Sequence, residues 1–164
     1  MDINASDIYS FYQTKLGGIV KRTIRQKIMF YLSEVETNII FGYGYTSPYL
    51  SFINKHNKSS QVKELRPDFL DGAVQEKYNF EEKIIHEYFI PLEPSTVDVV
   101  ISSHLLEFVE KPISSIEEIW RILKPNGYFI AILPRRSGLW SRYDNNPFGY
   151  GRSYSSKQFQ KLIE

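Results

Sequence analysis

The fold is decided by two apolar runs, Val97-Asp98-Val99-Val100-Ile101 and Tyr128-Phe129-Ile130-Ala131-Ile132-Leu133-Pro134. Nearly continuous runs of β-branched and aromatic residues are typical of strands that are covered on both faces. Between the runs, apolar residues recur at helical spacing: Ile116, Ile119, Trp120 and Leu123. Lys124-Pro125-Asn126-Gly127 is expected to stop this helix and turn the chain. Strand, helix and strand in this order predict a right-handed parallel βαβ unit.

A second informative stretch lies upstream, where Ile39-Ile40-Phe41 runs into Gly42-Tyr43-Gly44 and Pro48 follows. Glycines let the backbone turn sharply and leave room for a ligand beside bare main-chain N–H groups. Proline suits the first position of a helix, because its missing N–H would have no partner there. The pattern is that of a nucleotide-binding strand–turn–helix, and an ordinary tight turn is the alternative.

The remaining elements are predicted from periodicity and from turn and capping residues. Ser114 with Glu117 and Ser115 with Glu118 form two overlapping capping boxes, which predict that the central helix begins there. In the second N-terminal helix an apolar stripe of Leu16, Ile19, Val20, Ile24, Ile28 and Tyr31 is expected to face the sheet. The other predicted elements are helices over 7–14 and 16–32, strands over 61–65 and 83–87, and a last helix over 157–163 capped by Ser155 or Ser156.

Composition limits the class of protein. The chain has 164 residues, of which 42% are hydrophobic and 24% charged, as in a folded soluble domain. It contains no cysteine, which excludes disulfides, thiolate metal sites and cysteine nucleophiles. Its three histidines do not stand at ligand spacing, so no metal is expected. No window is long enough to span a bilayer, and the default expectation is a cytoplasmic domain without membrane contact. A nucleic-acid partner would rest only on the basic ends of the chain.

Two motifs carry a resemblance to a known family. Asp98-Val99-Val100-Ile101-Ser102-Ser103-His104-Leu105-Leu106-Glu107 and Glu118-Ile119-Trp120-Arg121-Ile122-Leu123-Lys124-Pro125-Asn126-Gly127 resemble class I S-adenosylmethionine (SAM)-dependent methyltransferases of the small-molecule "type 11" sort. That family has Asp-x-Val-x-x-x-x-x-Leu-Glu after its fourth strand and Arg-x-Leu-Lys-Pro-x-Gly before its fifth. The segments 134–140 and 147–152 are similar to a bacterial branch of the same family.

The resemblance implies a fold and a single domain over residues 1–164. The fold is Rossmann-like α/β, an open and mainly parallel sheet of about five strands with helices on both faces and an N-terminal helical extension. Residues 1–36 would form the N-terminal helices and residues 37–134 the core. Residues 135–164 would form an aromatic and basic loop and a terminal helix.

The resemblance also implies SAM as the cofactor and a small-molecule methyl acceptor. Gly42, Tyr43 and Gly44 would pass under the methionyl part of SAM, and Glu64, about 20 residues past Gly42, would hold the ribose hydroxyls. Further implied cofactor contacts are His86 and Glu87 near the adenine and Ser102 and Ser103 on the methyl-transfer side. His104 is the candidate general base, and a structural histidine at the strand end is the alternative.

The loop over 135–152 is the candidate acceptor wall. It would pack Trp140, Phe148 and Tyr150 on an acceptor and offer Arg142 and Arg152 to anionic groups. A loop that only covers the sheet is the alternative.

Departures from the family pattern keep other functions open. Tyr43 replaces a small residue, Thr46 and its neighbours lack the third glycine, and Arg66-Pro67 closes the second strand. The family continues through two more strands, without which the fifth strand is an open edge that a protein partner or a second copy would cover. A catalytically inactive methyltransferase-like binding domain is therefore the second hypothesis. A nicotinamide-dependent oxidoreductase is the third, and Ser47 in place of the last fingerprint glycine counts against it.

Overall fold

The computed structural model describes residues 5–56, 60–70, 81–86, 88–134 and 151–164. Within them the chain forms a parallel sheet of five strands in the order β3-β2-β1-β4-β5. The strands are β1 (Ile39–Gly44), β2 (Gln61–Pro67), β3 (Glu81–Ile85), β4 (Val97–Ser103) and β5 (Leu123–Ile132). The predicted open α/β sheet is confirmed.

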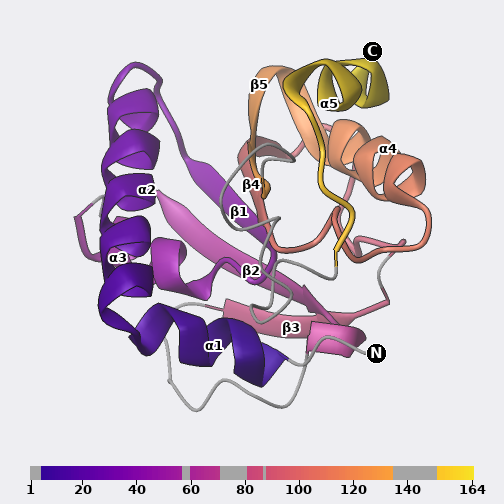
Figure 1. Cartoon of the computed structure of the whole chain (residues 1–164). Helices are drawn as coiled ribbons and strands as arrows, with labels where there is room; N and C mark the ends of the chain where they lie inside the picture. Colours follow the sequence, from indigo (N-terminus) through magenta and orange to yellow (C-terminus); the bar gives the residue numbers. More distant parts are fainter. Residues whose placement is uncertain (1–4, 57–59, 71–80, 87, 135–150) are drawn as a thin grey trace.

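Helices cover both faces of the sheet (Figure 1). They are α1 (Ala5–Gln13), α2 (Lys15–Ser33), α3 (Ser47–His56), α4 (Pro112–Ile122) and α5 (Ser156–Ile163), with a short 3-10 turn, η1 (Asp68–Leu70), after β2. Figure 1 shows α1, α2 and α3 on one side and α4 and α5 on the other. Each side has its own buried apolar cluster against the sheet.

The predicted βαβ unit is present as β4, α4 and β5, but α4 begins earlier than its serines suggested. Pro112 stands in the first turn and Lys111 at the N-cap makes no side-chain cap. Proline can open a helix without a donor, so the helix starts ahead of Ser114. Ser115 consequently lies inside the helix and is buried, and both predicted capping boxes are wrong. Ile116 and Ile119 face the core as expected, whereas Trp120 is 46% exposed.

The predicted turn over 124–127 is a bulge within β5. Pairing between β4 and β5 passes from Val97 opposite Leu123 to Val99 opposite Tyr128. Lys124 Nζ lies 2.7 Å from Asp98 Oδ1, while Asp98 Oδ2 accepts hydrogen bonds from the N–H groups of Asn38 and Ile39. Asp98 therefore ties together the starts of β1 and β4 and the bulge of β5.

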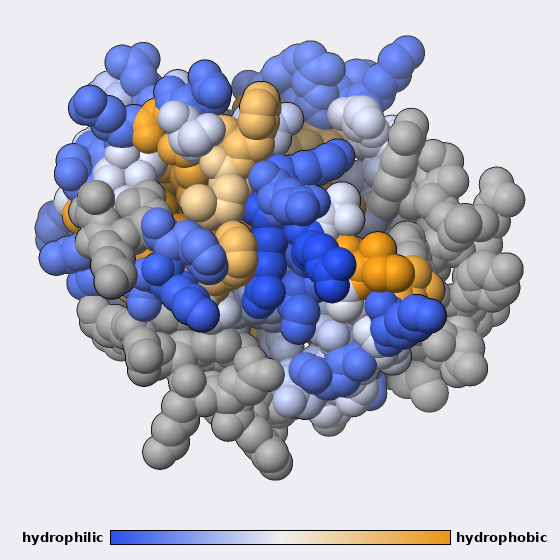
Figure 2. Space-filling model, turned by 90° about the vertical axis from the view of Figure 1, so that its left-hand side faces the viewer, coloured by the Kyte–Doolittle hydropathy of each residue, from blue (hydrophilic) through white to orange (hydrophobic). Residues whose placement is uncertain are grey.

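The two N-terminal helices meet at Thr14, which caps α2 by accepting a hydrogen bond from Gly17 N–H. A Cβ at Gly17 would stand 2.0 Å from Phe11 O, so glycine is needed where the helices cross. The predicted α2 stripe holds only in part, because Ile28 is buried whereas Leu16 and Ile19 are exposed. Figure 2 looks at the side of the molecule that is on the left in Figure 1 and shows hydrophobic patches separated by hydrophilic residues.

The last helix begins as predicted. Ser155 is the N-cap of α5, and its side chain and Gln158 form a reciprocal capping box.

Candidate functional site

The glycine turn lies at the carboxyl end of β1, directly beside the end of β4. Tyr43 pairs with Ser102 and Gly44 with Ser103. Gly44 has a φ of +102°, and a Cβ on it would stand 2.5 Å from Ser103 O. Tyr45 N–H donates to that same carbonyl at 2.8 Å. Glycine is therefore required at position 44 both by the backbone angle and by the close approach of β4.

Glu64 comes from β2, opposite Gly42 in β1, and is 1% exposed. Its Oε1 accepts from Thr46 N–H and Thr46 Oγ1 at 2.9 and 2.7 Å. Its Oε2 accepts from Ser47 Oγ at 2.6 Å and from Arg66 at 2.8 Å. The carboxylate thus stabilises the turn that leads into α3. Both oxygens already hold internal partners, so its contact with a ribose stays a prediction.

Tyr43 is fully buried, and its side chain belongs to the apolar cluster on the α4 side of the sheet. Tyr45 and Tyr49 are buried in the opposite cluster, with α1 and α2. The aromatic residues of the turn are thus divided between the two cores.

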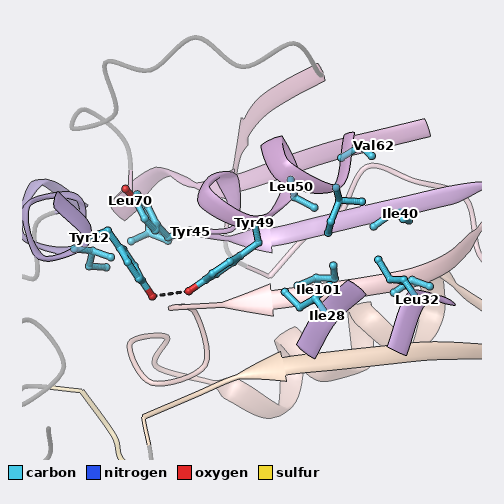
Figure 3. Packing of buried hydrophobic residues seen from close by; sticks show 13 residues of the cluster. Tyr12, Ile28, Leu32, Ile40, Tyr45, Tyr49, Leu50, Val62, Leu70 and Ile101 are labelled. Carbon is cyan, nitrogen blue, oxygen red and sulfur yellow. Dashed lines mark hydrogen bonds between the residues drawn. The ribbon is translucent and has the colours of Figure 1, made fainter. Parts of the chain in front are cut away.

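His104 follows β4 at a φ of +51° and is 4% exposed. Its Nδ1 lies 3.0 Å from Glu107 Oε1, and its Nε2 lies 2.8 Å from the Tyr12 hydroxyl of α1. The Tyr12 hydroxyl also contacts that of Tyr49 in α3 at 2.5 Å, as the dashed line in Figure 3 marks. The candidate base is therefore one member of a buried polar chain.

The two tyrosines that take part in these hydrogen bonds, Tyr12 and Tyr49, stay protonated over the physiological pH range. Burial raises the pKa of Tyr12 well above its usual range, and the neighbouring Tyr49 and Glu107 add to the rise. Burial also raises the pKa of Tyr49 to about 12. Both hydroxyls are consequently proton donors rather than bases.

Ser102 Oγ and Glu107 Oε2 are buried at this edge and have no hydrogen-bond partner among the described residues. Sequence reasoning named Ser102 but not Glu107, although Glu107 closes the first of the two motifs. It also missed Tyr12, for which the sequence holds no local signal, because Tyr12 and His104 are 92 residues apart.

The other predicted site residues lie at or beyond the edges of this cluster. His86 is exposed just after β3, and Glu87 lies outside the described residues. Asp68, which sequence reasoning did not single out, is the exposed carboxylate that directly follows β2. The positions of Trp140, Arg142, Phe148 and Tyr150 also lie outside the described residues.

Arg152, for which contact with anionic groups stays a prediction, donates to main-chain oxygens. Its N–H donates to Glu107 O at 2.8 Å and its guanidinium to Glu110 O at 3.0 Å. The hydroxyl of Tyr154 donates to Leu106 O at 2.9 Å. The segment over 151–154 therefore holds the loop that carries Glu107.

None of the described helices is both long enough and apolar enough to cross a membrane. Within the same ranges no three His, Asp or Glu side chains gather as a metal ion would require.

The glycine turn, Ser102 and His104 all lie at the carboxyl ends of parallel strands, where open α/β sheets bind their ligands. Fold and site together define a ligand-binding domain of the Rossmann-like class. The sequence matches the family described as a methyltransferase domain over residues 41–131. This chain therefore belongs to the methyltransferase-domain family. Its fold is that of solved SAM-dependent methyltransferases.

Two of the solved structures with this fold are SAM-dependent methyltransferases. A SAM-dependent methyltransferase of Thermotoga maritima superposes with a TM-score of 0.69 at 16% identity, over 95% of this chain and 73% of that one. A second, from Aquifex aeolicus, has a TM-score of 0.62 at 18% identity, over 85% and 76% of the two chains.

The human mitochondrial arginine-hydroxylase NDUFAF5 is 31% identical over 96 residues. The match spans 56% of this chain but only 26% of that relative.

Proposed function

We propose that this chain binds SAM at the carboxyl ends of β1 and β4 and transfers its methyl group to a small-molecule acceptor. The observation that carries the proposal is the buried hydroxyl of Ser102, which has no hydrogen-bond partner among the described residues. A buried polar group without a partner costs stability unless a ligand or water satisfies it. It lies beside the glycine turn, at the edge where this fold binds ligands.

The residues present fit such a cofactor. Gly44 holds a backbone angle that keeps the turn tight against β4. The hydroxyl of Ser102 supplies a polar contact from β4. At the end of β2, Asp68 is exposed whereas Glu64 is enclosed. We therefore propose Asp68 as a further candidate for the ribose hydroxyls, and Glu64 as the residue that shapes the turn. The proposed adenine contacts, His86 and Glu87, follow β3.

SAM supplies an activated methyl group, so the chain needs no nucleophile of its own. The work left to the protein is to align the acceptor and to exclude water. An acceptor that must lose a proton needs a base, and His104 is the proposed one. Burial of His104 and its neighbours provides the required exclusion of water.

The test is isothermal titration calorimetry with SAM and with its demethylated product. We expect saturable heat for the wild-type chain and clear weakening in Ser102→Ala and Asp68→Asn. Glu36→Gln, an exposed change before β1, is the matched control and should bind normally. Absence of heat at millimolar ligand would overturn SAM binding by this chain and favour the inactive binding domain.

A second candidate concerns the acceptor. The relative NDUFAF5 is named an arginine hydroxylase. This favours the alternative that the present chain acts on an arginine side chain of a protein. Mass spectrometry of an arginine-containing peptide, after incubation with SAM and the chain, tests for an added methyl group. An unchanged peptide together with a methylated small molecule would refute this candidate.

We also propose that another protein segment covers β5, which is the last strand of the sheet in the described residues. Beside it lies an apolar cavity of about 220 Å³ lined by Tyr31, Val99, Tyr128 and Ile130, among others. An unpaired strand edge readily adds another strand. Light scattering of the purified chain should reveal a dimer, and a strict monomer would limit the cover to a different protein.

A further inference from the structure

Four buried side chains from separate parts of the chain form one continuous line of hydrogen bonds. Tyr49 in α3 contacts Tyr12 in α1, Tyr12 contacts His104 after β4, and His104 contacts Glu107. The three contacts measure 2.5, 2.8 and 3.0 Å. All four residues are nearly inaccessible to solvent. The line links the N-terminal helix to the strand end where the acceptor is expected.

The carboxylate at one end sets the direction in which all three hydrogen bonds are donated. A carboxylate can only accept, so the Nδ1 of His104 must carry the hydrogen that faces Glu107. In a neutral imidazole the other nitrogen, Nε2, is then an acceptor. It takes the hydroxyl hydrogen of Tyr12, whose oxygen in turn accepts from Tyr49. Tyr12 and Tyr49 are both suited to this role, because burial raises the pKa of each hydroxyl.

The same contact holds α1 over the carboxyl end of the sheet. The ring of Tyr12 lies parallel to that of Tyr45, with centroids 6.3 Å apart, and edge-on to that of Tyr49 at 6.2 Å. Its hydroxyl then reaches past both rings to His104. Figure 3 shows Tyr12 extending from α1 towards Tyr49 and the strand ends. An apolar side chain of equal size would fill the space but could not form this hydrogen bond to Nε2.

We propose that Tyr12 is a latch that holds α1 closed over the site. We also propose that Glu107 and Tyr12 are positioning residues that fix the tautomer of His104, with Nε2 as its accepting nitrogen. This rests on the proposed function in one respect, namely that an acceptor enters beside His104. The latch predicts the chemical class of that acceptor. A group that replaces the Tyr12 hydroxyl on Nε2 must itself donate a hydrogen, as an alcohol, phenol or amine does. Its proton passes to Nε2, and Glu107 stabilises the resulting imidazolium.

The first test is spectroscopic and needs no cofactor. Two-bond proton–nitrogen NMR correlations distinguish the two tautomers and the charged form of each of the three histidines. His104→Gln assigns the signal. We expect the Nδ1–H tautomer at neutral pH in the wild-type chain. Glu107→Gln should preserve it, because an amide oxygen still accepts from Nδ1, whereas Glu107→Leu should give mixed tautomers. An Nε2–H or imidazolium form in the wild type would overturn the proposal.

The second test measures the latch by hydrogen exchange of the α1 amides. Tyr12→Phe keeps the ring but removes the hydroxyl, and we expect roughly tenfold faster exchange across α1. Tyr88→Phe is the matched control, because it also removes one bonded hydroxyl, the acceptor of Lys111 N–H ahead of α4. It should leave the exchange of α1 unchanged. Equal exchange of α1 in the two variants would refute the latch.

Failure of the latch and failure of the proposed function are distinguishable. Both tests are done without SAM, so they stand even if calorimetry shows no binding. Conversely, SAM binding and methyl transfer by a chain whose α1 exchange does not respond to Tyr12→Phe would uphold the function and reject the latch.

Discussion

Removing Arg66 should destabilise the chain strongly, because it leaves the Glu64 carboxylate charged, buried and without its cation. In the substitution Arg66→Met the apolar part of the side chain is largely kept while the guanidinium is lost. The Arg66 and Glu64 side chains are 9% and 0% exposed, and their contact measures 2.8 Å. Breaking such a pair from one side costs ~3–5 kcal/mol. For a chain of this size that corresponds to a fall in Tm of ~6–20 °C.

The substitution Lys124→Met is the matched comparison, because it also removes the cation of an ion pair, but of one that is more exposed to solvent. Lys124 and Asp98 are 2.7 Å apart, but their side chains are 36% and 17% exposed. Water therefore screens this pair, and we expect a loss of only ~0–1 kcal/mol. Both variants are compared with the wild type by urea unfolding at one pH. The double variant Glu64→Gln/Arg66→Met removes the buried charge with its partner and should recover part of the loss. If Arg66→Met costs no more than Lys124→Met, the reasoning from burial is wrong.

Three further predictions concern the glycine turn, the core under α4 and the loss of stability at acid pH. Gly44→Ala should lower the free energy of unfolding by ~1–3 kcal/mol through the positive φ and should abolish the heat of SAM binding in calorimetry. Gly18→Ala, with open space around the added Cβ, should leave SAM binding unchanged and keep or raise the stability of the helix. Ile119→Ala opens a cavity under α4 and should cost ~2–5 kcal/mol in urea unfolding, while Ile113→Ala on the exposed face of the same helix should stay within about 0.5 kcal/mol. Burial opposes the charge of Asp98, but Lys124 and the N–H groups of Ile39 and Asn38 outweigh it and lower the pKa of that carboxyl. The contribution of Asp98 to stability should therefore be complete above its unfolded-state pKa and vanish as the pH falls through the lower folded-state pKa. Asp98→Asn should consequently make Tm depend less on pH in the acid range.

Sequence periodicity was sufficient for the sheet and for most helices, because those elements follow from local patterns. The apolar runs lie within β4 and in the second half of β5, and Ser155 caps α5 through Gln158, three positions away. The start of α4 was misjudged because Pro112 and the serines compete for the same role. Part of the α2 stripe was misjudged because the close crossing of α1 at Gly17 sets which face turns inwards.

The site was only partly predictable, because its decisive contacts join residues far apart in the chain. Gly44 and Ser103 were expected at one edge and do lie together. The partners of Glu64, however, depend on the register of β1 against β2, which places its carboxylate beneath the turn. The environment of His104 depends on Tyr12, whose position is set by how α1 packs rather than by any motif.

The unusual tyrosines of the glycine turn now have a structural reason. In the family pattern a small residue stands at position 43, and a tyrosine there could have filled the cofactor site. Tyr43 instead points into the core beneath α4. Tyr45 and Tyr49 form the surface that receives Tyr12, through one parallel ring contact, one edge contact and a hydrogen bond. Aromatic rings in such arrangements contribute beyond their buried area. The same substitutions that weakened the motif in the sequence therefore dock α1 against the edge where an acceptor would bind. If so, reducing Tyr45 to alanine should release α1 as Tyr12→Phe does, and hydrogen exchange of α1 would show it.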